Sequence, residues 1–397
     1  MDFLLLICII LGFSFVFSKF LEKVNLPRII APLMLGILFN YFDIISSSEY
    51  INILEFLSSF AIMMLLFYIG LELNLKDTKE LEKETFFFAM FGFVISFFLG
   101  FLTFYFLFNQ SFITSFVIGS ILSVAGETVL VVILEQNKLL KTKVGEIIIG
   151  ATLIDNILGL LLIGIISILA TSQMFEIMSF LPIIIAIVIF ILGVFFLRYI
   201  AQFIDYIFIN SNFKVYDVFT CSIIFLFLFA FVSHFLGLDI SLGAIMFGLL
   251  LNFSLNKVGI VGEDEEHDIN RFVKNITFGF LFYFFFFWVG FNFEINMFLS
   301  SPMLGIIFIL IAFVGKYFSG LISSYFSKDT FSNGSIIGIG MATKGGVELI
   351  IAEIARKAGL ISIEIFSGIV FMSLVLIFIC PIVFSVYLKF KNKHDLL

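Results

Sequence analysis

The sequence has little charge, proline or cysteine, and each shortage excludes a class of protein. Only 13% of the 397 residues are charged, 61% are hydrophobic and the mean hydropathy is +1.20, which is too apolar for a soluble domain. There are only 5 prolines, and no proline- or serine-rich linker or low-complexity tract separates parts of the chain. The 3 cysteines, Cys8, Cys221 and Cys380, are scattered through apolar runs. They therefore indicate neither a disulfide framework nor a metal site.

Basic residues and histidines are also scarce. The net charge is −7 and the pI is about 5.1, so no basic face is available for nucleic acid. Much of the acidic excess falls in the segment Glu263–Glu266, which we predict to be a solvated loop. The 3 histidines, His234, His267 and His394, have no ligand spacing. We therefore expect no enzymatic centre and no cofactor.

Long apolar runs fill the chain instead, and they predict a polytopic all-α membrane protein. The first run, Phe3–Phe17, lacks the basic start and the cleavage site of a signal peptide, so we interpret it as the first span. The sequence predicts thirteen spans, at 2–18, 28–43, 52–73, 84–108, 112–136, 144–170, 176–200, 215–236, 239–254, 275–293, 301–325, 333–357 and 363–388.

Lysine and arginine collect in alternate loops between these spans, as they do on the cytoplasmic side of a membrane. They follow the odd-numbered spans, beginning with Lys19 and Lys23 and ending with Lys389–Lys393. Arg356 and Lys357, after the twelfth span, are the exception. This pattern predicts an external N-terminus and an internal C-terminus.

Two halves of the sequence resemble each other. The segment Phe67–Leu73 returns as Phe287–Phe293, and Leu33–Asn40 returns as Ile245–Asn252. Matching spans are seven crossings apart, so the second copy has the opposite orientation, as in many transporters. We predict one transmembrane domain over residues 1–397, with inverted repeats at about 1–170 and 215–388, a connecting span at 176–200 and no soluble regulatory domain.

Two matching spans carry glycine and polar residues near their middle, which indicates interrupted helices. These segments are Ser123–Thr128, which contains Glu127, and Ala342–Glu348, which contains Thr343 and Lys344. Close packing of small residues would explain the glycines but not buried charge. Lys344 and Glu348 are four residues apart, so they either neutralise each other or contact an ion directly.

An aspartate and an asparagine lie near the middle of the sixth span, at Asp155 and Asn156. Burial disfavours a carboxylate and a nearby cation favours it, so protons and metal ions can compete at such a position. Lys316 is the basic residue at the middle of the eleventh span and is the natural partner of Asp155. A purely structural buried aspartate is the alternative.

These motifs resemble the membrane domain of the monovalent cation:proton antiporter-2 family, which includes Kef-type and Nap-type exchangers. The resemblance covers nearly the whole chain. It rests on Leu26–Pro27 leading to Leu35–Gly36, Phe67–Glu72, Ser123–Thr128, Ile154–Gly159, Gly315–Lys316 and Met341–Glu348. It implies a homodimer in which a core bundle with two crossed interrupted helices moves against a dimerisation bundle, exposing one ion site alternately to each side.

One position departs from the family pattern. Electrogenic members carry two adjacent aspartates in the sixth span, the first pairing with the lysine and the second binding the ion. Here Asp155 fills the first place and Asn156 the second. Either this chain uses a different ion chemistry or an aspartate has been replaced.

The sequence therefore predicts an antiporter that exchanges Na⁺, or alternatively K⁺, for H⁺ in the bilayer of a bacterial inner membrane. Asp155 would be the ion and proton site, with Asn156 and Thr128 as oxygen donors, Glu127 as an acidic assistant and Lys316 as counter-charge. Secondary candidates are Ser123, Thr343, Lys344 and Glu348. Alternatives are a Kef-like K⁺ efflux system and an ion-sensing membrane subunit that transports nothing. A bile-acid-like symporter would not need the Asp155–Lys316 pair.

Overall fold

The fold is known from a computed structural model, and every regular element in the described part of the chain is a helix. The structure describes residues 3–23, 26–45, 47–72, 83–126, 130, 134, 137, 139, 142–171, 215–235, 240–258, 263–300 and 302–390. The predicted connecting span 176–200 lies outside these residues. Every other predicted span contains a described helix, which agrees with the expected polytopic architecture.

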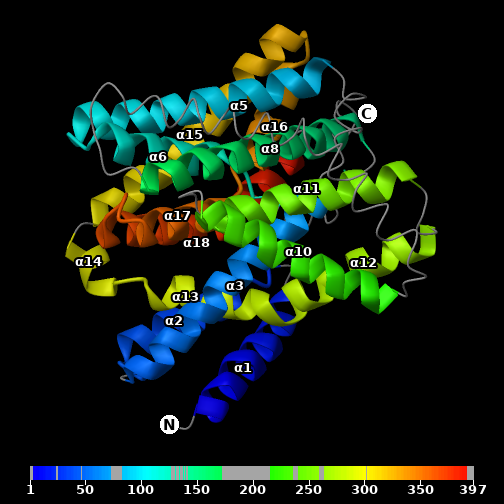
Figure 1. The fold of residues 1–397 in the computed structure, drawn as a ribbon. Coiled ribbons are helices and arrows are strands. Elements are labelled where there is room, and N and C mark those ends of the chain that lie inside the picture. Colours follow the sequence, from blue (N-terminus) through cyan, green and yellow to red (C-terminus); the bar gives the residue numbers. More distant parts are fainter. Residues whose placement is uncertain are drawn as a thin grey trace. The chain divides into compact units, whose positions relative to one another are not determined.

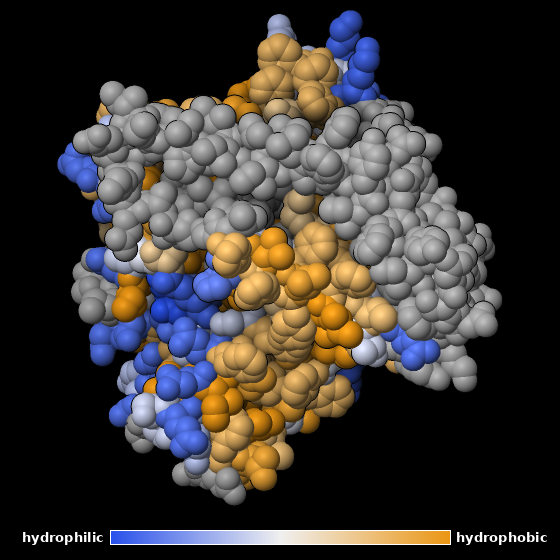
Figure 2. Space-filling model, in the orientation of Figure 1, coloured by the Kyte–Doolittle hydropathy of each residue, from blue (hydrophilic) through white to orange (hydrophobic). Residues whose placement is uncertain are grey.

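Long apolar helices dominate the described residues. Among the described residues, 6 helices are long and apolar enough to cross a membrane: Phe3–Lys23, Ser48–Leu71, Lys83–Leu107, Asn270–Phe291, Pro302–Ser327 and Ile363–Phe390. Many of their large apolar side chains are exposed, including Leu107 (75%) and Phe390 (89%). Figure 2 shows hydrophobic residues over much of the described surface on one face. Such a surface is unfavourable in water and matches a lipid environment.

The chain divides into two compact units, each assembled from separate stretches of sequence. Unit 1 comprises Met1–Ser46, Leu75–Gly159 and Phe286–Leu397. It contains α1 (Phe3–Lys23), α2 (Ile30–Tyr41), α5 (Lys83–Leu102), the π-helical segment η1 (Thr103–Leu107), α6 (Phe112–Ser123), α14 (Ile295–Ser300), α15 (Pro302–Ser327), α16 (Phe331–Met341), α17 (Val347–Lys357) and α18 (Ile363–Phe390). The first part of α8 (Lys143–Thr171) also belongs to it. Within this unit α5 packs on α6 and α15, and α15 also packs on α16 and α18 (Figure 1).

Unit 2 comprises Ser47–Asn74 and Leu160–Phe285. It contains α3 (Ser48–Glu72), the rest of α8, α10 (Val215–Phe235), α11 (Ile240–Val258), α12 (Glu263–Ile276) and the π-helical segment η3 (Thr277–Leu281). The helix α13 (Phe282–Phe291) continues from η3 into unit 1. Within unit 2, α11 packs along α3 and α10.

The repeated glycines pack crosswise inside the two units. In unit 1, Gly36 of the first repeat lies against the backbone at Gly290 of the second, and there is no room for a side chain at either position. In unit 2, Gly248 of the second repeat lies in the same way against Gly70 of the first. An asparagine one turn further on reinforces each contact: the Asn40 amide donates to the Phe291 carbonyl, and the Asn252 amide donates to the Leu71 carbonyl.

The acidic segment Glu263–Glu266 differs from its prediction. We expected a solvated loop, but α12 begins at Glu263 and runs to Ile276. Its 14 residues are amphipathic, with acidic residues at the start and both basic and apolar residues in the second half. Acidic residues are favourable in a first helical turn because they meet the positive end of the helix dipole. A run of like charges therefore did not exclude a helix here.

Candidate functional site

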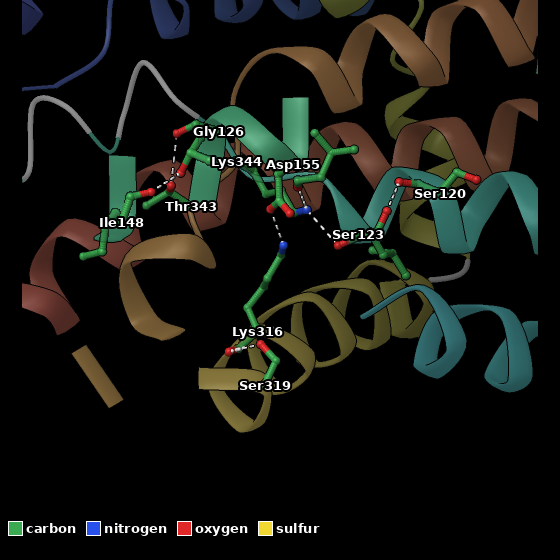
Figure 3. Close-up of polar contacts among 12 residues, drawn as sticks. Ser120, Ser123, Gly126, Ile148, Asp155, Lys316, Ser319, Thr343 and Lys344 are labelled. Carbon is green, nitrogen blue, oxygen red and sulfur yellow. Dashed lines mark hydrogen bonds and ion pairs between the residues drawn. The ribbon is translucent and has the colours of Figure 1, made fainter. Parts of the chain in front are cut away.

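The site is built where two interrupted helices of unit 1 cross. The helix α6 ends at Ser123, and Val124 continues in extended conformation to Gly126. On the other side α16 ends at Met341 and α17 begins only at Val347. The two breaks are joined reciprocally: the Gly126 amide donates to the Thr343 carbonyl at 2.7 Å, and the Thr343 hydroxyl donates to the Gly126 carbonyl at 3.1 Å (Figure 3).

Gly126 is required by this close approach. A Cβ at this position would lie 2.5 Å from the carbonyl carbon of Lys344 and 2.7 Å from its oxygen, closer than real side chains come. Both atoms are backbone, so the conflict cannot be relieved by rotating a side chain. The glycine thus allows the two chain breaks to touch.

We expect Gly126→Ala to lower stability strongly because it forces the crossing apart. Overpacking typically costs about 1–3 kcal/mol, and the cost is at the upper end when no rotamer can relieve it. The measurement is the melting temperature of the purified protein in detergent. Gly12→Ala is the matched control, since a Cβ there has nothing within 4 Å. Equal melting temperatures for the two variants would contradict the packing described here.

Lys344 closes the carboxyl end of α6. Its side chain is fully buried, and Nζ donates to the carbonyls of Leu122 at 2.9 Å, Ile121 at 3.4 Å and Val124. The last carbonyls of a helix have no partner within the helix and carry partial negative charge. The buried Lys344 ammonium therefore satisfies these carbonyls, and their partial negative charge compensates its positive charge.

Glu348 closes the amino end of α17. Its carboxylate accepts hydrogen bonds from the amides of Gly345 and Gly346, the latter at 3.1 and 3.2 Å, and from the Ser373 hydroxyl at 3.2 Å. Glu348 attracts the Lys344 ammonium electrostatically, as one of the two sequence alternatives expected, but each of the two charges makes its hydrogen bonds to a helix end. The chain between them is not helical, so a spacing of four residues does not place them on one face, and each charge binds a helix end instead.

Asp155 and Lys316 form a buried ion pair beside the crossing. Asp155 lies on α8 and Lys316 on α15, both side chains are 0% exposed, and Nζ donates to Oδ2 at 2.6 Å (Figure 3). The second oxygen, Oδ1, is buried and has no hydrogen-bond partner among the described residues. The Lys344 ammonium also attracts the Asp155 carboxylate. The pair expected from sequence is therefore present, with one oxygen of the carboxylate still able to accept.

The other predicted residues have different outcomes. Ser123 donates to the Ser120 carbonyl at 2.8 Å, a contact within its own helix. Thr343 belongs to the crossing, as described above. Glu127 and Thr128 lie outside the described residues. Asn156 is part of α8, but its side chain is not described.

Sequence reasoning missed a second buried charge cluster in unit 1. Glu353 of α17 is 0% exposed; it accepts from the Trp288 indole at 2.9 Å and from two nitrogens of Arg356, at 2.8 and 2.9 Å. Lys357 lies 3.9 Å from the same carboxylate. Arg356 and Lys357 were the exceptions to the loop charge pattern, and this was the available signal. Their charge is partly neutralised by a buried carboxylate, so they do not act as free basic residues.

Comparison with known proteins agrees with this architecture. The profile of the family described as sodium/hydrogen exchanger, transmembrane, matches residues 4–390. A Na⁺/H⁺ antiporter of Enterococcus hirae is 24% identical over 98% of this chain and 99% of its own length. A probable Na⁺/H⁺ antiporter 3 of Methanocaldococcus jannaschii is 28% identical over 94% of each chain.

A solved structure supports the fold independently of these sequences. The sodium proton antiporter MjNhaP1 from Methanocaldococcus jannaschii, determined at pH 8, superposes with a TM-score of 0.71. It is 17% identical and covers 98% of this chain and 99% of its own. Broken helices at matching positions, a buried aspartate–lysine pair beside them and a family match over nearly the whole length lead to one conclusion. The chain belongs to the sodium/hydrogen exchanger family and is a multi-pass membrane protein.

Proposed function

We propose that this protein is a secondary active antiporter that exchanges Na⁺ for H⁺, with Asp155 as the site where the two compete. The observation that carries the proposal is the state of the Asp155 carboxylate. One oxygen is paired with Lys316 at 2.6 Å, and the other is buried without a hydrogen-bond partner among the described residues. A buried acceptor left in this way costs free energy unless a ligand or proton uses it.

The charges around the crossing suit a site that alternates between two positive ligands. Asp155 and Glu348 contribute two negative charges, and Lys316 and Lys344 two positive charges, all fully buried. Lys344 and Glu348 are held by helix ends and serve as fixed charges. The Asp155–Lys316 pair is the exchangeable part. A cation arriving at Asp155 replaces the ammonium as its partner, and a proton leaving the pair keeps the buried charge balanced.

Further oxygen ligands come from the residues proposed on sequence. Asn156 and Thr128 supply neutral oxygens for the cation, and Glu127 is an acidic assistant. Alternating access exposes the site to each side in turn, and the protein works as a homodimer in a bacterial inner membrane. K⁺ is the second candidate cation, as in Kef-type systems, and it would use the same ligands.

The direct test is transport by the purified full-length protein in proteoliposomes. An imposed Na⁺ gradient should drive proton movement in the opposite direction, read by a pH-sensitive dye. A K⁺ gradient of the same size tests the second cation, and empty liposomes are the control. If neither a Na⁺ nor a K⁺ gradient drives proton movement, the proposal is rejected, and the protein is a sensor or anchoring subunit.

The asparagine at position 156 gives a second prediction. We expect Asn156→Asp to strengthen Na⁺-dependent exchange because it adds a carboxylate beside Asp155. The extra charge should also make transport more sensitive to membrane potential, since each charge moved is worth about 2.3 kcal/mol per 100 mV. Exchange is measured with and without a K⁺–valinomycin potential. If neither rate nor voltage dependence changes, Asn156 is not a ligand.

A further inference from the structure

Gly92 lies beside the ammonium of Lys316, where α5 faces α15. A Cβ at this position would lie 3.5 Å from Nζ of Lys316, 3.4 Å from Cε of Met341 and 3.8 Å from Oγ of Ser319. These are ordinary contact distances, so alanine would fit here. The position is buried, and a methyl group on it would rest against the ammonium.

Glycines at other helix contacts of unit 1 have a clear steric reason. A Cβ at Gly338 would come within 2.8 Å of the Lys316 carbonyl, and one at Gly100 within 2.7 Å of Leu122. Gly92 has no such conflict. Glycine in a helix interior is less favourable than alanine by about 0.8–1.0 kcal/mol. Packing therefore does not require a glycine at position 92.

The Lys316 ammonium needs solvation if it is to leave Asp155. It carries three N–H groups, and among the described residues its one hydrogen-bond acceptor is Asp155. The nearby charges do not help, because Lys344 repels it. Ser319 lies near the flank of the ammonium that faces Gly92. Its hydroxyl donates to the Lys316 carbonyl at 2.7 Å, and the hydroxyl oxygen can still accept a hydrogen bond.

We propose that Gly92 is a positioning residue for Lys316, which keeps one flank of the ammonium open to a hydrating water molecule. This inference rests on the proposed function. Such a water molecule would bind between Nζ and the Ser319 hydroxyl, and it stabilises the displaced ammonium after a cation has taken its place at Asp155 and before the pair releases a proton. Water is similar in size to the methyl group that position 92 accepts, and a buried water is stable where it meets polar partners. Gly92 thereby sets how readily the ion pair opens.

The test compares Gly92→Ala and Gly92→Ser in the full-length protein in proteoliposomes. Alanine fills the flank with an apolar group, so the closed pair is favoured and Na⁺ competes less well. We expect its KM for Na⁺ to rise about tenfold, the effect of losing one hydrogen bond to a charged group. Serine offers a hydroxyl in place of the water, so its KM should stay within about twofold of the parent. Gly12→Ala is the control for a glycine-to-alanine change in a helix.

Each outcome decides the question. A raised KM in the alanine variant, restored by serine, with an unchanged or higher melting temperature without Na⁺, supports the inference. Equal KM values for alanine and parent overturn it. A raised KM shared by alanine and serine also overturns it, because bulk rather than hydration would then be the cause. If Asp155→Asn abolishes exchange while the Gly92 variants behave like the parent, the proposed function stands and only this inference fails.

Discussion

The Asp155→Asn variant is expected to show no Na⁺-driven proton movement above empty liposomes while remaining folded. Asparagine has the same shape and can still accept from the Lys316 ammonium, so the side-chain packing is retained, although the ammonium loses its counter-charge and stability falls. It has no charge to offer a cation and cannot bind a proton in exchange. Because the Asp155–Lys316 pair is fully buried, no solvent-exposed carboxylate can substitute for it.

Binding gives an independent measurement for this variant. A ligand that binds only the folded state stabilises it by about 2.7 kcal/mol at a concentration one hundred times its Kd. Na⁺ should therefore raise the melting temperature of the parent but not of Asp155→Asn. The matched control is Asp43→Asn, which removes an exposed carboxylate. Full exchange by Asp155→Asn would remove Asp155 from the mechanism.

Lys316→Gln is expected to have the largest effect on stability. Removing one partner of a buried ion pair leaves an uncompensated charge, which typically costs about 3–5 kcal/mol. Combining it with Asp155→Asn removes both charges, so the double variant should recover part of the loss. The expected coupling between the two substitutions is about 1–3 kcal/mol, as for other polar residues in contact.

Melting temperatures of the parent, both single variants and the double variant complete this cycle. Lys19→Gln is the control, because its ion pair with Glu22 is on the surface (53% and 35% exposed) and such pairs are worth about 0–1 kcal/mol. Na⁺ should stabilise Lys316→Gln more than the parent, since the cation then supplies the missing positive partner of Asp155. Strictly additive losses with no effect of Na⁺ would show that Asp155 and Lys316 are independent.

The sequence predicted those parts of the site that depend on the cost of burial. An ionisable residue in the middle of an apolar run needs a partner, and this was enough to pair Asp155 with Lys316 although they are 161 positions apart. Glycines beside polar residues likewise indicated the break between α16 and α17. Both inferences rest on the free-energy cost of removing charged and polar groups from water, which applies wherever the chain is buried.

Predictions that relied on local spacing were less successful. The spacing of Lys344 and Glu348 is that of a pair on one helical face, but the helix is interrupted between them, so the spacing rule does not apply. Glu353 was overlooked because it is close to the end of its span, where a carboxylate is ordinary. In the structure it is buried and accepts a hydrogen bond from Trp288, which is 65 positions away. Gly92 was overlooked for the same reason, because its proposed role depends on the Lys316 ammonium of another helix.

The crosswise packing of the repeated glycines bears on the origin of the two halves. Gly36 meets Gly290 and Gly248 meets Gly70, so each half supplies one member of both contacts. A half expressed alone would leave both of its glycine surfaces without their complement. A gene that encoded a single half would therefore need two copies of its product to make both contacts. In the present chain these contacts lie within one molecule, with Asp155 in one half and Lys316 in the other.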